Sequence, residues 1–303
     1  MKFEVTILGS SSATPVYNRN PSAQLLNCNE KFYLIDCGEG TQQQLIKFGL
    51  KASKIDAAFI SHLHGDHYFG LIGLLSTMHL NGRIKPFHIF APAPLKDILE
   101  IQFRHSDTNL RFVIEFIAVD ATAPEVIFEN HDMVVETIIL NHRIPTTGFK
   151  FSERKRLRKV LAEKLEADQV PAELYPLLKK GLDLTLPGGR MIRNSDYTVD
   201  SEAPKSYAYC SDTLADGSYL RSISGSTVLY HEATFLHELL ERAHMTHHTT
   251  ALQAAQVARD TGAGRLLIGH FSSRYKVLSP LLEEAQSIFP RTELAIEGIT
   301  ISI

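Results

Sequence analysis

A cluster of potential metal ligands at the end of a strand pattern is the feature that most constrains the fold of this chain. Residues 55–61 are mostly apolar and predict a short buried strand. The segment His62-Leu63-His64-Gly65-Asp66-His67 follows at once. In an extended segment the first two histidines point to the same side, and a turn can then bring the aspartate and the last histidine close by. Imidazole and carboxylate groups suit zinc or a similar divalent ion, so this spacing predicts a metal site.

Three further candidate ligands stand at the ends of other strand patterns. His142 follows an apolar run, Asp212 follows a tyrosine-rich one, and His270 follows Leu266-Leu267-Ile268-Gly269. Counted from His67, successive ligands are 75, 70 and 58 residues apart. Spacing this wide means that the tertiary structure has to assemble the site. We therefore expect these strand ends to meet at one edge of a layered α/β fold.

Strand and helix patterns alternate along most of the 303 residues. Strand patterns cover residues 3–8, 22–28, 31–36, 55–61, 86–90, 111–116, 133–141, 228–230, 265–268 and 293–303, and helix patterns cover 41–48, 68–80, 95–105, 250–261 and 280–288. Thr41 is a candidate cap for the first of these helices. The alternation favours two sheets with outer helices, and a single α/β domain can reach this length.

Residues 150–193 differ in composition from the rest of the chain. They contain eleven basic and six acidic residues, a net charge of +5, whereas the whole chain carries −3 and the remainder therefore −8. Five cations crowd the start of an expected helix whose leucines share one face: Arg154, Lys155, Arg156, Arg158 and Lys159. Two interpretations stay open from composition alone, a solvated helix with an ordinary charge run or a basic arm for a polyanion.

Composition excludes several classes of protein. Hydrophobic residues make up 44% and charged residues 21%, which is typical of a globular chain and not of a disordered one. A net charge of −3 argues against a uniformly basic nucleic-acid binder. No apolar run is long enough for a membrane-spanning helix, and the first residues enter a strand pattern without a signal peptide, so we expect a cytoplasmic protein. The three cysteines have no paired spacing, which argues against a disulfide framework or a cysteine zinc site.

Longer strings resemble the ribonuclease Z family, the tRNA 3′-processing endonucleases of the metallo-β-lactamase superfamily. The strings are Leu-Ile-Asp-Cys-Gly-Glu-Gly-Thr-Gln at 34–42, the segment 61–67, His-Glu-Ala-Thr-Phe at 231–235, His-Thr-Thr-Ala-Leu-Gln-Ala-Ala at 248–255, and Gly-His-Phe-Ser-Ser-Arg-Tyr at 269–275. The first two indicate only the superfamily, and the third and last are more specific. The resemblance implies a four-layer αββα sandwich formed by residues 1–303 as a single domain, with an inserted substrate-binding arm at residues 150–193.

The same resemblance implies two zinc ions per chain and a water activated between them. One ion would be bound by His62, His64 and His142, the other by Asp66, His67 and His270, with Asp212 bridging both. Asp66 would also orient or deprotonate the water. His248 would act as the general acid and Glu232 would orient it, with the adjacent His247 as the alternative if the alignment slips by one residue. Asp36 is expected to support the ligand loop.

The substrate implied by the family is precursor tRNA, cleaved by a homodimer to leave a 3′-hydroxyl on the tRNA. Arg19 and Arg274 are candidates for holding a phosphate, together with Arg154, Lys155, Arg156 and Arg158 of the arm. Two positions depart from the family pattern. Tyr17 replaces a phosphate-binding lysine, which leaves the preference for precursors with or without CCA open. Val170 replaces the glycine of a Gly-Pro pair in the arm, which leaves the conformation of the arm open.

Two rival functions remain. A metallo-β-lactamase-fold phosphodiesterase acting on small phosphodiesters would share every metal ligand but would not need the basic arm. An RNA-binding module with structural metals is disfavoured, because seven ligands for two ions leave positions open for water whereas structural zinc sites are closed.

Overall fold

The computed structural model describes residues 2–303, which form two compact units. One unit combines the chain up to Ser152 with Ser206–Ile303, and the other is Glu153–Lys205. The second unit overlaps the arm expected at residues 150–193, but its limits differ. Residues 150–152 belong to strand β9 (Thr146–Glu153), whose Lys150 pairs with Ala208 of β14 (Ser206–Cys210) in the first unit.

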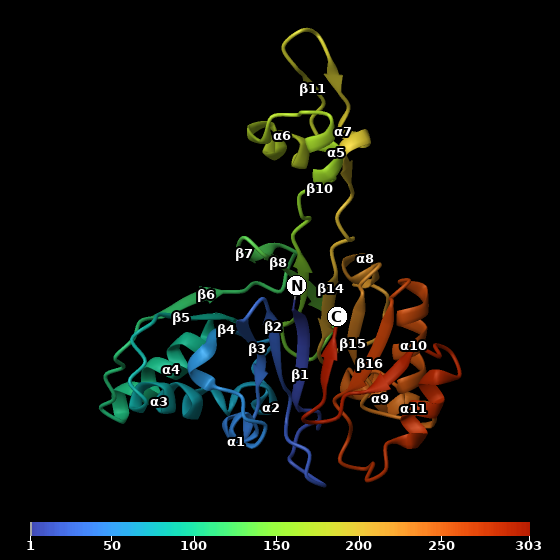
Figure 1. Ribbon diagram of the computed structural model, residues 1–303. Coiled ribbons are helices and arrows are strands. Elements are labelled where there is room, and N and C mark those ends of the chain that lie inside the picture. Colours follow the sequence, from blue (N-terminus) through green and yellow to red (C-terminus); the bar gives the residue numbers. More distant parts are fainter. Residues whose placement is uncertain (1) are drawn as a thin grey trace. The chain divides into compact units, whose positions relative to one another are not determined.

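The first sheet of the larger unit has seven strands in the order β18-β1-β2-β3-β4-β5-β6 (Figure 1). Their bounds are β1 Phe3–Gly9, β2 Ala23–Cys28, β3 Lys31–Cys37, β4 Ile55–Phe59, β5 Phe87–Ala91, β6 Ile114–Ala118 and β18 Thr300–Ser302. Strands β3 to β6 are parallel, so their carboxyl ends lie at one edge of the sheet. The ligand-rich segment 62–67 leaves this edge shortly after β4.

The second sheet also has seven strands, in the order β17-β16-β15-β14-β9-β8-β7. The remaining bounds are β7 Val126–Glu129, β8 Met133–Leu140, β15 Val228–Glu232, β16 Arg265–Gly269 and β17 Thr292–Leu294. Strands β14 to β17 are parallel. The residues that follow β14 and β16, and the last residue of β15, therefore share one edge, and these include Asp212, His270 and Glu232.

The two sheets face each other across an apolar core, and helices cover their outer faces (Figure 1). Helices α1 (Thr41–Lys47), α3 (Leu71–Leu80) and α4 (Pro94–His105) pack on the first sheet, and α10 (Ala251–Asp260) and α11 (Ser279–Gln286) pack on the second. In the central core the ring of Phe59 stacks on Phe90 at 4.6 Å between ring centroids. This arrangement confirms the predicted four-layer αββα sandwich.

Shorter elements complete the larger unit. These are η1 (Ala52–Lys54), α2 (Gly65–Tyr68), α8 (Leu220–Ile223), η3 (His237–Leu239) and α9 (Leu240–Thr246). Within residues 2–303 we find no helix with the length and apolar character needed to span a membrane.

Several predicted elements differ from the observed ones. The helix expected at 68–80 is divided into α2 and α3 at Gly70, where a Cβ would lie 2.2 Å from the Gly38 carbonyl oxygen, so glycine allows this close approach. The single strand expected at 293–303 is two strands, β17 and β18, which belong to different sheets. Thr41 does not cap α1, because Gly40 is the N-cap and the Thr41 hydroxyl donates to Gly38. By contrast, Thr250 caps α10 in a capping box with Gln253.

The smaller unit, Glu153–Lys205, has its own apolar core. It contains β10 (Lys159–Val160), α5 (Ala162–Ala167), η2 (Ala172–Leu174), α6 (Tyr175–Lys179), β11 (Leu184–Thr185), β12 (Met191–Ile192), α7 (Asn194–Tyr197) and β13 (Thr198–Val199). The buried residues are Leu165, Val170, Leu178, Ile192 and Tyr197. Val170 thus fills the core of this unit at the position where the family pattern has glycine.

The prediction of a helix that begins with the cluster of cations is wrong. Residues 154–158 have no regular secondary structure, and α5 begins only at Ala162. Like charges three and four positions apart would repel each other on a helix, which favours the extended chain observed here. The unit as the structure bounds it carries eleven basic and nine acidic residues, a net charge of +2, so its positive charge is concentrated in residues 154–159.

Candidate metal centre and active site

The structure brings together all seven predicted ligands at the facing edges of the two sheets. The first sheet supplies the loop after β4 and the short helix α2, and the second sheet supplies the residues after β8, β14 and β16. The seven candidate ligands form two groups, His62, His64, His142 and Asp212 in one and Asp66, His67 and His270 in the other, and His248 forms a third group with Asp212 and His270. The ends of strands that are distant in sequence therefore meet at one place, as expected for a layered α/β fold.

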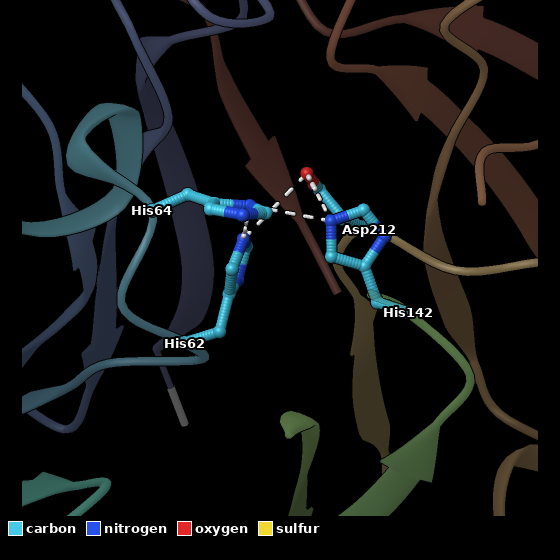
Figure 2. Close-up of side chains that lie close together, drawn as sticks. All are labelled: His62, His64, His142 and Asp212. Atoms are coloured by element: carbon cyan, nitrogen blue, oxygen red, sulfur yellow. Dashed lines mark hydrogen bonds and ion pairs between the residues drawn. The ribbon is translucent and has the colours of Figure 1, made fainter. Parts of the chain in front are cut away.

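The first group converges on a single small region (Figure 2). Nε2 of His62 lies 3.1 Å from Nδ1 of His64, and Nε2 of His142 lies 3.3 Å from the same atom. Oδ2 of Asp212 completes the group, 3.6 Å from Nε2 of His62 and 3.8 Å from Nε2 of His142. Burial lowers the pKa of His142 to about 4 and the pKa of His62 well below its ordinary value. The imidazoles are therefore neutral and offer lone pairs, as metal ligands must.

The second group faces the other oxygen of Asp212. Oδ1 of Asp212 lies 3.4 Å from Nε2 of His67 and 3.2 Å from Nε2 of His270. Oδ2 of Asp66 lies 3.5 Å from Nε2 of His67 and 3.4 Å from Nε2 of His270. Because each oxygen of Asp212 faces a different group, this carboxylate has the placement of a ligand that bridges two cations.

The side chains of the second group have an unsatisfied atom and negative charge that a cation would balance. Nε2 of His67 is buried and has no hydrogen-bond partner in the part of the chain that the structure describes. Burial alone would lower the pKa of His67, but the carboxylates of Asp212, Asp66 and Asp36 outweigh it and hold that pKa well above its ordinary value. The three carboxylates around this ring therefore favour a positive charge on the ring or next to it, and a proton or a metal ion can supply that charge.

The outer nitrogens of three ligands are held by fixed acceptors. Nδ1–H of His67 donates to Asp36 at 2.7 Å, and Nδ1–H of His142 donates to the His247 carbonyl at 2.8 Å. Nδ1 of His270 lies 2.9 Å from the hydroxyl of Thr234. Such contacts fix the tautomer, so Nε2 of each ring faces the centre. Asp36 was predicted from the sequence, whereas Thr234 was not, and its only sequence signal is its place in the His-Glu-Ala-Thr string.

Beside the second group lies a buried pair of His248 and Glu232. Nδ1 of His248 lies 2.8 Å from Oε1 of Glu232, which is fully buried and also accepts from the backbone N–H of Thr213. Burial disfavours the charged ring, but Glu232 outweighs it and raises the pKa of His248 to about 9. The ring centroid of His248 is 5.4 Å from that of His270 and 5.2 Å from that of His142. The ring is therefore held next to the ligands with its Nδ1 paired to a carboxylate.

His247, the alternative to His248, occupies a different place. It follows α9 with a left-handed backbone, φ 55°, and its carbonyl accepts from the candidate ligand His142. Of these two adjacent histidines it is His248 that pairs with Glu232.

The predicted substrate-binding residues have different environments. Arg19 is mostly buried, and its Nη2 donates to the Tyr275 carbonyl at 2.7 Å, so any contribution to phosphate binding is expected to be indirect. Arg274 is exposed. In the smaller unit Arg156 lies 3.8 Å from Glu153, and Arg158 is paired with Asp200 and donates to Thr198. The other two predicted arm residues, Arg154 and Lys155, are exposed.

Arg143 was not selected from the sequence, although it lies at the site. This exposed residue follows the ligand His142 and lines a cavity of about 540 Å³ together with Asn141 and Asp216. Its guanidinium contributes to lowering the pKa of His64, after burial, and opposes the raised pKa of His248. Its position next to a ligand was the only sequence signal.

Comparison with known proteins places this site in a family. A family model described as "Anti-Pycsar protein Apyc1" matches residues 3–158, which end before Asp212, His248 and His270. Over nearly the whole chain, a ribonuclease Z of Cytophaga hutchinsonii is 47% identical across 301 residues, covering 98% of this chain and 95% of that protein. The chain belongs to the ribonuclease Z family. This membership confirms the family suggested by the sequence strings.

Solved structures agree with the family and the fold. The crystal structure of the short form of human tRNase Z is 28% identical, with a TM-score of 0.71 and 99% of each chain covered. The metallo-β-lactamase fold protein YhfI of Bacillus subtilis is 19% identical with a TM-score of 0.70, and it supports the fold alone.

Proposed function

We propose that this protein is an endoribonuclease that removes the 3′ trailer from precursor tRNA, with two zinc ions in the site. The observation that carries the proposal is the placement of Asp212 between two groups of candidate ligands, in a chain that matches a ribonuclease Z over nearly its whole length. Two adjacent cations are suited to hydrolysis of a phosphodiester, because both the attacking and the leaving oxygen carry negative charge.

His62, His64 and His142 would hold one zinc ion, and Asp66, His67 and His270 the other, with Asp212 shared. Bound there, the two ions would supply a water of lowered pKa and would neutralise charge that develops on the phosphate. The nitrogen-rich set with two carboxylates suits zinc, and three of its imidazoles have their outer nitrogens held.

The protein's own groups would supply the proton transfers. Asp66 accepts the backbone N–H of Ala13 through Oδ2 at 2.8 Å, which fixes its carboxylate, and this group would orient the reacting water or take its proton. His248 would protonate the leaving 3′-oxygen of the tRNA, and this transfer leaves the tRNA with a 3′-hydroxyl. Glu232 would keep Nδ1 of His248 protonated, so that Nε2 delivers the proton.

The basic run at residues 154–158 supports recognition of a folded RNA. Cations clustered on an extended segment suit a phosphate backbone, and such contacts set affinity more than sequence preference. We further propose that the protein works as a homodimer in the cytoplasm, as the family resemblance implies. Measurement of the protein's mass in solution would test whether it is a homodimer.

The decisive experiment is incubation of the purified protein with a precursor tRNA, followed by mapping of both cleavage ends. We expect one cut at the 3′ end of the tRNA body, a 3′-hydroxyl on the tRNA and a 5′-phosphate on the trailer, and loss of cleavage after chelation. Intact precursor alongside rapid hydrolysis of a small phosphodiester would overturn the proposal and favour the small-ester phosphodiesterase.

A further inference from the structure

Asp36 is a fully buried carboxylate that contacts the ligand loop from behind. It lies near the end of β3, and its Oδ1 accepts the backbone N–H of Ser61 at 2.8 Å. Its Oδ2 accepts from Nδ1 of His67 at 2.7 Å and from the Ser61 hydroxyl at 3.0 Å. A buried carboxylate is costly unless donors satisfy it, so the number and direction of these donors decide where its oxygens lie.

A further donor to this carboxylate comes from the opposite sheet. The hydroxyl of Tyr209, on β14, donates to Oδ2 of Asp36 at 2.6 Å. The Tyr209 ring is 1% exposed and stacks on Tyr230 with 4.8 Å between centroids and 13° between planes. Burial and the nearby Asp36 carboxylate raise the pKa of Tyr209 well above its ordinary value, so the group remains a phenol that donates. The hydroxyl therefore has a fixed position and a fixed direction.

We propose that Tyr209 is a positioning residue for His67, acting through Asp36, and that it thereby sets the affinity of the Asp66–His67–His270 group for its metal ion. The inference rests on the proposed role of His67 as a ligand. The Tyr209 hydroxyl and the His67 N–H meet at the same carboxylate oxygen, so the hydroxyl limits rotation of the carboxylate and keeps Oδ2 opposite Nδ1 of His67. Contacts of this kind orient a ligand ring and typically change metal affinity by roughly 10- to 100-fold.

The same strand offers a matched control. Tyr207 lies two residues earlier on β14, so its side chain points to the same face, and it is also fully buried. Its hydroxyl donates to Oε1 of Gln24 at 2.5 Å, and Gln24 is not one of the proposed ligands. Tyr207→Phe therefore removes a buried tyrosine hydroxyl from the same core without touching Asp36.

The test compares Tyr209→Phe and Tyr207→Phe with the wild type. Zn²⁺ binding is measured in competition with a chelating dye, and Co²⁺-loaded protein is examined by visible absorption. We expect Tyr209→Phe to bind one of its two ions about tenfold more weakly and to show an altered Co²⁺ spectrum. Tyr207→Phe should match the wild type in both, while the two metal-free variants lose similar stability in urea. Unchanged Zn²⁺ affinity in Tyr209→Phe, or an equal loss in Tyr207→Phe, would overturn the inference.

A measurement on the wild type covers the case in which Tyr209→Phe does not fold. In Zn²⁺-loaded protein, ¹⁵N NMR should show His67 protonated at Nδ1, with a proton that exchanges slowly because Asp36 and Tyr209 enclose it. A His67 protonated at Nε2, or a rapidly exchanging Nδ1 proton, would overturn the inference. Failure of the proposed function is distinguishable, since it would appear as uncut precursor tRNA with Zn²⁺ affinities that still differ between the two tyrosine variants.

Discussion

Glu232 holds both His248 and, through the hydroxyl of Thr234, the candidate ligand His270. Oε1 of Glu232 lies 2.8 Å from Nδ1 of His248, and Oε2 accepts from the Thr234 hydroxyl at 2.6 Å. That hydroxyl lies 2.9 Å from Nδ1 of His270, so its oxygen accepts the His270 N–H. A single buried carboxylate thus fixes the tautomer of a candidate general acid and supports a candidate metal ligand.

The first prediction concerns the proton donor. His248→Ala should lower kcat for precursor-tRNA cleavage by about 10²- to 10⁴-fold, because a general acid acts chiefly in the transition state. Metal content and tRNA affinity should stay close to those of the wild type. Steady-state kinetics and metal analysis check this.

The matched control is His247→Asn, since asparagine tolerates the left-handed backbone at that position and the carbonyl that orients His142 remains. If this variant loses kcat and His248→Ala does not, the general acid is His247.

A second prediction concerns pH and the metal-free protein. Glu232 raises the folded-state pKa of His248 from 6.5 to about 9. A raised pKa contributes stability that is fully present below the unfolded pKa and is lost as the pH rises through the folded value. The contribution of His248 to the free energy of unfolding should therefore decrease as the pH rises from about 6.5 to about 9.

Glu232→Gln should abolish that fall and return the pKa of His248 toward or below its ordinary value, because burial then acts alone. Urea unfolding across this pH range, together with NMR titration of His248, provides the measurement. A pKa near 9 that persists in Glu232→Gln would contradict the assignment of its cause.

The third prediction concerns metal number. Seven ligands with one shared carboxylate predict about two zinc ions per chain and complete loss of cleavage after chelation, with recovery on adding Zn²⁺. Asp212→Ala should weaken both sites, because each of its oxygens faces a different group. Mass spectrometry measures the number of metal ions per chain. A fully active preparation with one ion per chain would refute the shared-carboxylate site.

The fourth prediction separates tRNA recognition from chemistry. Replacing Arg154, Lys155 and Arg156 with Ala should weaken precursor-tRNA binding and reduce its salt dependence by roughly one unit for each lost phosphate contact. Hydrolysis of bis(p-nitrophenyl) phosphate should hardly change. Arg158 is left in place because its pairing with Asp200 and Thr198 supports the fold of the smaller unit.

Lys179→Ala with Lys180→Ala is the control for these arm variants, since both are exposed lysines of the same unit outside the cluster. Equal losses on tRNA and on the small diester would mean that residues 154–156 support the fold. No loss on either substrate would identify them as an ordinary solvated surface.

The sequence alone determined the parts of this protein that depend on local pattern. Apolar runs ending in His or Asp marked strand ends, and the parallel strands of a layered α/β fold bring such ends to common edges, so the sequence could predict that His62, His142, Asp212 and His270 lie close together. The helix pattern at residues 250–261 likewise predicted α10, which the structure begins at Ala251 with Thr250 as its cap.

Only the tertiary structure decided the relationships between residues that are distant in the chain. It determined that His248, and not its neighbour, faces Glu232, because the end of α9 sets which of two adjacent side chains turns inward. It divided the last strand pattern between two sheets, and it left residues 154–158 extended where a helix was expected. It also brought the Tyr209 hydroxyl to Asp36 across 173 positions of sequence, a contact without a local signal because it arises from the packing of one sheet against the other.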